Sequence, residues 1–126
     1  MNVPSNLKYT KDHEWVLIDG NTGIIGITDY AQGELGDIVF VDIDPNLPAI
    51  SGGDSFGTVE AVKTVSDLYA PCSGKVIEIN KKLNDEPQLV NSDPYGEGWM
   101  IKVEITDAAQ LNELMDEQAY KQLIGQ

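Results

Sequence analysis

Short runs of β-branched, aliphatic and aromatic residues, each closed by a turn signal, fill most of the chain. HEWVLI and TGIIGIT are separated by DGN, whose Asp-Gly pair favours a hairpin. DIVFVDI, SFGTVE, VSDLYA, GKVIEIN and WMIKVEI continue the pattern, and the Pro- and Gly-containing DPNLPAISGGD is typical of a loop. A chain of 126 residues is long enough to bury a core of its own. These features predict one mainly β domain over 1–126.

Two stretches favour helix instead. TDYAQGEL begins with Thr28, a suitable N-cap, and predicts one or two helical turns. From Asp107 onward the apolar residues recur at helical spacing, and Asp107 with Gln110 forms a plausible capping box. We therefore predict a C-terminal helical segment over about 107–124. The long polar connection KKLNDEPQLVNSDPYGEG has room for a further helical turn, and we expect its NSDPYGEGW portion to be a structural corner.

The charge balance narrows the classes of partner. Eight lysines, no arginine and 21 acidic residues give a formal net charge of −13, which would repel nucleic acid and anionic membranes. Partners with basic surfaces fit this charge, although the same charge also serves solubility. With one cysteine, Cys72, and one histidine, His13, the chain offers no internal disulfide and little for a zinc site.

The expected cellular location rests on the membrane-spanning and targeting segments that the sequence lacks. No apolar run approaches the roughly 18 residues of a membrane span. The first twenty residues resemble neither a secretory signal nor an Arg-rich presequence. We expect a cytoplasmic protein, and a trimmed organellar form is the alternative that stays open.

One lysine, Lys63, lies midway in the sequence between two glycines. Gly52 lies eleven residues before Lys63, and Gly74 lies eleven residues after it. This spacing predicts a hairpin over about 52–74 with Lys63 near its tip. The tip sequence AVKT has no Gly, Asn or Pro, which favours a loop of about four residues built on a type I turn. Such a lysine is either an ordinary solvated side chain or a group that another enzyme modifies, and the spacing leaves both open.

A resemblance to a known family covers nearly the whole chain. HEWV, GITDYAQGELGDIVFV, VEAVKTVSDLYAPCSG, NSDPYGEGW and LMDEQAYKQLI follow, in order, the motifs of the glycine cleavage system H proteins. The resemblance implies a flattened β-barrel, the barrel-sandwich hybrid of lipoyl and biotinyl domains, with short helices and a C-terminal helix. It also implies that Lys63 carries covalent lipoate as lipoyllysine, and that Glu60 is recognised by the lipoyl-attaching enzyme.

The neighbours of the lysine separate related carriers. Biotin carriers usually flank their lysine with methionines, whereas Val62 and Thr64 flank Lys63 here. Lipoyl domains of 2-oxoacid dehydrogenases typically show Asp-Lys-Ala and sit in longer chains with flexible linkers. This compact chain, with Glu60 three residues before the lysine, resembles the H proteins more closely.

The resemblance implies a non-catalytic carrier. It would take the aminomethyl group of glycine from glycine decarboxylase (P protein) to aminomethyltransferase (T protein), and electrons to dihydrolipoamide dehydrogenase (L protein). Two alternatives stay open. One is an H-like relay that passes lipoyl groups to other enzymes, which needs the lysine but no cleft for the aminomethyl group. The other is an unmodified acidic adaptor domain.

The loaded arm ends in an ammonium, which favours carboxylates inside a cleft that excludes water. Glu14 and Asp67 match the acidic positions of the family's cleft, and Asp12 stands where other members often carry serine. His13 invites a general-base interpretation, but the sequence supplies no nucleophile for it, so we expect it to pack beside Trp15. Cys72 likewise lacks a visible activating base, and we expect it to pack at a bend.

Overall fold

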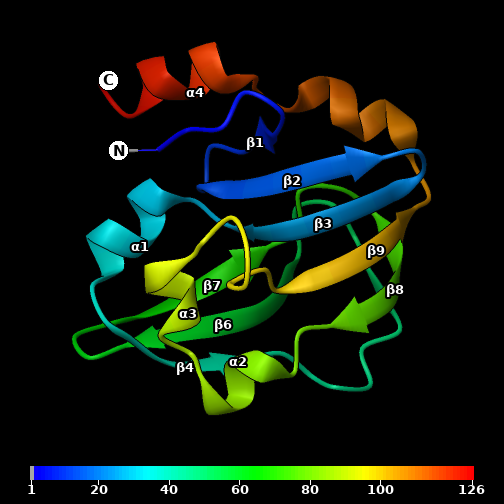
Figure 1. The fold of residues 1–126 in the computed structure, drawn as a ribbon. Helices are drawn as coiled ribbons and strands as arrows, with labels where there is room; N and C mark the ends of the chain where they lie inside the picture. Colours follow the sequence, from blue (N-terminus) through cyan, green and yellow to red (C-terminus); the bar gives the residue numbers. More distant parts are fainter. Residues whose placement is uncertain (1) are drawn as a thin grey trace.

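Two antiparallel sheets build the domain, in a computed structural model that describes residues 2–126 (Figure 1). The larger sheet has the order β1 (Lys8–Tyr9), β2 (Glu14–Asp19), β3 (Thr22–Ile27), β9 (Ile101–Ile105), β8 (Gly74–Ile79) and β5 (Ala49–Ile50). The smaller sheet has the order β4 (Ile38–Asp42), β6 (Ser55–Ala61) and β7 (Val65–Tyr69). The prediction of a mainly β barrel-sandwich fold is confirmed.

The core lies between the two sheets because alternate strand residues point inward. Val16, Ile25 and Val103 come from the larger sheet, and Val59 and Leu68 come from the smaller one; none exposes more than 1% of its surface. Burying each such side chain contributes about 1.5–3 kcal/mol relative to leaving it in water. On the outer face of the three-stranded sheet, Phe40, Glu60 and Asp67 are exposed.

Three short helices connect the strands. In α1 (Asp29–Leu35), the Thr28 hydroxyl accepts a hydrogen bond from the Ala31 N–H at 3.1 Å, which confirms the predicted N-cap. Two single-turn helices, α2 (Lys82–Asp85) and α3 (Leu89–Ser92), occupy the long polar connection. Within residues 2–126, no helix is both long and apolar enough to cross a membrane.

The C-terminal segment is helical, as predicted over about 107–124, and consists of two pieces: the 3-10 helix η1 (Ala108–Glu113) and α4 (Glu117–Leu123). The break has a tertiary cause, because the backbones of Met115 and Tyr9 exchange two hydrogen bonds of 2.8 Å. Helical spacing alone cannot reveal that pairing. The predicted capping box is half wrong. Asp107 does cap the Ala109 N–H, but the Gln110 side chain accepts a bond of 2.6 Å from the Ser73 N–H.

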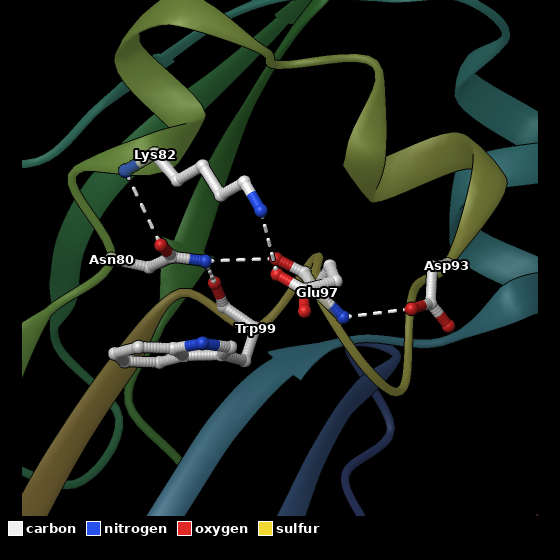
Figure 2. A network of polar contacts seen from close by, with 5 residues as sticks. All are labelled: Asn80, Lys82, Asp93, Glu97 and Trp99. Atoms are coloured by element: carbon white, nitrogen blue, oxygen red, sulfur yellow. Dashed lines mark hydrogen bonds and ion pairs between the residues drawn. The ribbon is translucent and has the colours of Figure 1, made fainter.

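A polar network centred on Asn80 holds the loop before β9 against the start of α2 (Figure 2). The Asn80 amide donates to the carbonyl oxygens of Glu97 and Trp99 at 2.8 and 2.7 Å, and its oxygen accepts from the Lys82 N–H. Glu97 in turn donates its N–H to Asp93 and pairs with the Lys82 ammonium at 3.1 Å. The loop is therefore fixed by a nearly buried amide, and the exposed ion pair adds little.

We expect Asn80→Ala to lower the free energy of unfolding by about 1–3 kcal/mol, because the carbonyl groups of Glu97 and Trp99 lose the donor that holds the loop. Urea titration followed by tryptophan fluorescence measures the change. Asn84→Ala is the matched control, since Asn84 is exposed on α2. Equal changes in the free energy of unfolding for the two substitutions would show that the Asn80 network does not stabilise the loop.

Candidate functional site

The tip of the β6–β7 hairpin presents Lys63. The pairing of the two strands ends at Glu60 and Val65, so the tip is residues 61–64, four residues as predicted. The Ala61 N–H donates to the Thr64 carbonyl at 2.8 Å and closes the tip. The Val62 N–H donates to the Asp37 carbonyl at 3.2 Å, which ties the tip to the connection between α1 and β4. Backbone hydrogen bonds on both sides of Lys63 therefore fix the position of the hairpin tip.

The Lys63 side chain is exposed and uncommitted. Within the described residues, no hydrogen bond or ion pair holds its ammonium. Its stem passes Gly36, which ends α1 with a φ of 81°; a Cβ there would lie 3.8 Å from the Lys63 Cε. The ammonium is therefore accessible to another protein, as a modification site requires.

Strand alternation places Glu60 and Asp67 on the outer face of the smaller sheet. Glu60 lies between Phe40 and Val65 in register, and Asp67 lies in the next row, opposite Thr58. Among residues 2–126, the Asp67 carboxylate makes only long contacts, accepting from the hydroxyls of Ser55 at 3.4 Å and Tyr69 at 3.5 Å. Both carboxylates are exposed and available to a visiting group.

A cleft of about 360 Å³ opens where the end of β7 meets the β1–β2 connection and the C-terminal segment. Glu14 and Asp12 both line it. Asp67 does not, but its neighbour Tyr69 does, so Asp67 lies between the cleft and Lys63 along β7. The remaining lining residues are Tyr9, Thr10, Lys11, Gly53, Ala70, Pro71, Glu113, Leu114 and Met115.

Glu14 is a buried carboxyl at the wall of this cleft, only 2% exposed. The Thr10 hydroxyl donates to its Oε1 at 2.6 Å, and the Tyr69 N–H donates to its Oε2 at 3.3 Å. Burial raises the pKa of Glu14 to about 7, and nearby Asp12 adds to the rise, while the two hydrogen bonds oppose it. A cation entering the cleft would favour the ionised form. The cleft is therefore suited to a small cationic group.

His13 connects this region to the C-terminal helix. We predicted that it packs beside Trp15, but it packs against the rings of Tyr30 and Tyr120 instead. The ring centres lie 4.9 and 5.8 Å from that of His13. Its Nδ1 lies 2.9 Å from the Tyr120 hydroxyl, which also lies 2.7 Å from the hydroxyl of Thr28. Burial lowers the pKa of His13. Its φ of 70° reverses the chain between Asp12 and Glu14, so its place is structural.

Cys72 is fully buried, and burial raises the pKa of its thiol, so it packs as expected and is no nucleophile. Sequence reasoning missed Thr10, Tyr69 and Tyr120, which hold Glu14 and His13. A hydroxyl four residues before Glu14 was the only local signal, since the other two partners lie 55 and 107 residues away. Among residues 2–126, no group of three or more His, Cys, Asp or Glu side chains is arranged to hold a metal.

The two sheets and the lysine at the hairpin tip define a barrel-sandwich domain of the lipoyl and biotinyl type. The family model "Glycine cleavage H-protein" matches residues 7–126. A glycine cleavage system H protein of Staphylococcus saprophyticus is 59% identical over 126 residues, covering all of both chains. One of Carboxydothermus hydrogenoformans is 59% identical over 122 residues, covering 97% of this chain and 94% of that relative.

A solved structure agrees. The crystal structure of a glycine cleavage system H protein from Mycobacterium marinum superposes with a TM-score of 0.89 at 40% identity, covering 98% of this chain and all of that one. The chain belongs to the glycine cleavage system H protein family.

Proposed function

We propose that this protein is the lipoylated carrier of a glycine cleavage system, with lipoate joined by an amide bond to Lys63. It takes the aminomethyl group of glycine from glycine decarboxylase to aminomethyltransferase, and passes electrons to dihydrolipoamide dehydrogenase. Family membership over nearly the whole chain supports this function. The observation that supports Lys63 as the attachment site is its exposed ammonium, which lies at the hydrogen-bonded tip of the hairpin.

The surroundings of Lys63 fit a long covalent arm. A lipoyl group there supplies a dithiolane that accepts a one-carbon unit and two electrons. Lys63 provides the amide nitrogen, and its stem passes over Gly36, where a side chain would approach it. Tethering raises the effective concentration of the arm at each docked enzyme. The chain itself contributes position and not chemistry, as a carrier component would.

The cleft fits the cationic end of a loaded arm. Outward-facing Val65, Asp67 and Tyr69 lead along β7 from the tip to the cleft rim. There, we infer, Glu14 becomes ionised and holds the ammonium through a charge-assisted hydrogen bond. Asp12 at the rim and Asp67 on the way add negative charge. A loaded group held against the cleft walls has less contact with water, which would otherwise remove it by hydrolysis.

The intact mass of the protein from its native host tests this function. We expect a lipoyl increment that maps to Lys63, and an aminomethyl gain after glycine and the matching decarboxylase are added. A lipoyl increment without a response to glycine would overturn the carrier role in favour of the relay. Bare mass, in a host that lipoylates its other carriers, would leave an unmodified adaptor.

A further inference from the structure

The hydroxyl of Thr10 makes two hydrogen bonds to the same residue, Glu14. It accepts from the Glu14 N–H at 3.1 Å and donates to the Glu14 Oε1 at 2.6 Å. Within the part of the chain that the structure describes, no other side chain is hydrogen-bonded to this buried carboxyl. Its second partner is a backbone group, the Tyr69 N–H at 3.3 Å, which any residue except proline would provide. Thr10 is therefore the side chain on which the hydrogen bonding of Glu14 depends.

Backbone bonds hold Thr10 and Glu14 together at the turn between β1 and β2. The Thr10 N–H donates to the Glu14 carbonyl at 3.0 Å, and the His13 N–H donates to the Thr10 carbonyl at 3.1 Å. The positive φ of His13 reverses the chain within this turn. Because these bonds do not involve the Thr10 side chain, we expect the turn to persist when a residue of the same shape replaces Thr10.

The two oxygens of the Glu14 carboxyl face different kinds of partner. Oε2 faces an N–H, which can only donate, so this oxygen is best left without a proton. The acid proton of neutral Glu14 therefore belongs on Oε1, which faces the Thr10 hydroxyl. A hydroxyl has two lone pairs, so it can accept from the Glu14 N–H and from the acid proton together. When Glu14 is ionised, the same hydroxyl donates to Oε1 instead.

We propose that Thr10 is a positioning residue for Glu14, because its hydroxyl satisfies Oε1 and holds the carboxyl against the cleft in both protonation states. The inference rests on the proposed function and deepens it. When the ammonium of a loaded arm enters the cleft, the O–H bond of neutral Glu14 breaks and its proton passes to solvent. The Thr10 hydroxyl then turns from accepting to donating, and this charge-assisted bond favours the ionised form. A side chain without a hydroxyl could do neither.

The other titratable groups around Glu14 act on it without a side-chain hydrogen bond to its carboxyl, as far as the described residues show. Three of them are exposed charges, Lys11, Asp12 and Glu113, whose fields are screened by water and salt. The whole set consists of Tyr9 of β1, Lys11, Asp12 and His13 of the β1–β2 connection, Asp67 and Tyr69 of β7, Glu113 of η1 and Tyr120 of α4. A substitution of Thr10 leaves all of these groups in the protein.

Titration of Glu14 in the unlipoylated protein, followed by carbon NMR of its carboxyl, tests the hydrogen-bonding role of Thr10. We expect Thr10→Val, which keeps the shape and removes the hydroxyl, to raise the titration midpoint by about one pH unit, because ionised groups gain more from a hydrogen bond than neutral ones. Thr10→Ser retains the hydroxyl and should titrate as wild type does. Thr106→Val is the matched control, since Thr106 is exposed just after β9, and it should also match wild type.

Release of formaldehyde from lipoylated protein loaded with glycine and the matching decarboxylase tests the role of Thr10 in retention. At pH 7, Thr10→Val should release it at least about threefold faster than wild type, because an empty cleft whose Glu14 keeps its proton competes less well for the ammonium. Thr10→Ser should restore slow release. In a Glu14→Gln background, Thr10→Val should change the rate less than about twofold, because a positioning residue acts through the group that it positions.

An unchanged Glu14 titration in Thr10→Val would overturn the inference while leaving the carrier function intact. The same titration shift in Thr10→Ser as in Thr10→Val would also overturn it, since the hydroxyl would then not be the cause. So would equal acceleration of release by Thr10→Val with Glu14 and with Gln at position 14. If Thr10→Val fails to fold, Thr10→Ala takes its place in each comparison. Wild-type protein that gains no aminomethyl group would defeat the proposed function, and the role of Thr10 in retention with it.

Discussion

Lys63→Arg should abolish lipoylation and all glycine-dependent loading. Arginine keeps the positive charge at the hairpin tip, but its guanidinium does not form the amide that the amine of Lys63 forms with an activated acyl group. The side chain is exposed and bonded to nothing among the described residues, so the free energy of unfolding should stay within about 0.5 kcal/mol of wild type. Intact mass after incubation with a lipoate ligase, lipoate and ATP measures the first effect, and urea titration the second.

Lys75→Arg is the control for Lys63→Arg, because Lys75 is also exposed, on β8. It should gain the full lipoyl increment. Acylation of Lys63→Arg at another lysine would contradict the assignment of this one position. A loss of stability in Lys63→Arg would mean that the tip depends on the lysine in a way that its contacts do not show.

The long strands could be predicted because they are rich in β-branched, aliphatic and aromatic residues and are bounded by turn signals. β1 and β5 could not, since each has only two residues, and two residues show no period. Helical spacing identified the C-terminal segment but not its division into two helices, for a related reason. The residues of η1 and α4 do have that spacing, but the backbone of Met115 pairs with Tyr9, 106 positions earlier, and breaks the helix. Tertiary pairing decides such cases, and local pattern does not contain it.

The candidate site divides in the same way. The frame of glycines around Lys63 is local, and the structure has a hairpin there. The burial and pKa of Glu14 do not depend on its sequence neighbours alone. Its burial depends on Thr10, on the end of β7 and on the C-terminal segment, which meet only in the folded protein. Sequence could therefore propose a carboxylate in a cleft, but not that its pKa approaches neutrality. That property leads to the largest expected effect on stability.

Glu14→Gln should make the folded protein more stable above neutral pH. Folding raises the pKa of Glu14 from 4.5 to about 7, so between these values the folded state holds a proton that the unfolded chain has released. The free energy of unfolding of wild type therefore falls as pH rises through this interval, by about 3 kcal/mol in all. Glutamine does not titrate, so the variant should lack this fall and gain up to about 3 kcal/mol at pH 8.

Urea titrations of wild type and Glu14→Gln from pH 4 to pH 8 measure this difference. Glu78→Gln, which removes an exposed carboxylate on β8, should follow wild type throughout. The glutamine oxygen can still accept from the Thr10 hydroxyl, but its amide would face the Tyr69 N–H, which reduces the gain. Parallel curves for wild type and Glu14→Gln would show that Glu14 is solvated in solution.

The same buried carboxyl should make retention of a loaded arm depend on pH in the opposite sense. If Glu14 must be ionised to hold the ammonium, retention weakens as the pH falls through the pKa of Glu14 in the loaded protein. Because the ammonium favours the ionised carboxylate, that pKa lies below the value of about 7 that holds for the empty cleft. Release of formaldehyde from glycine-loaded protein should accelerate accordingly, and in Glu14→Gln it should be fast and independent of this titration. A stabilising substitution that destroys retention would show that the cleft gives up stability for function. Slow release from the variant would mean that the cleft walls alone protect the arm.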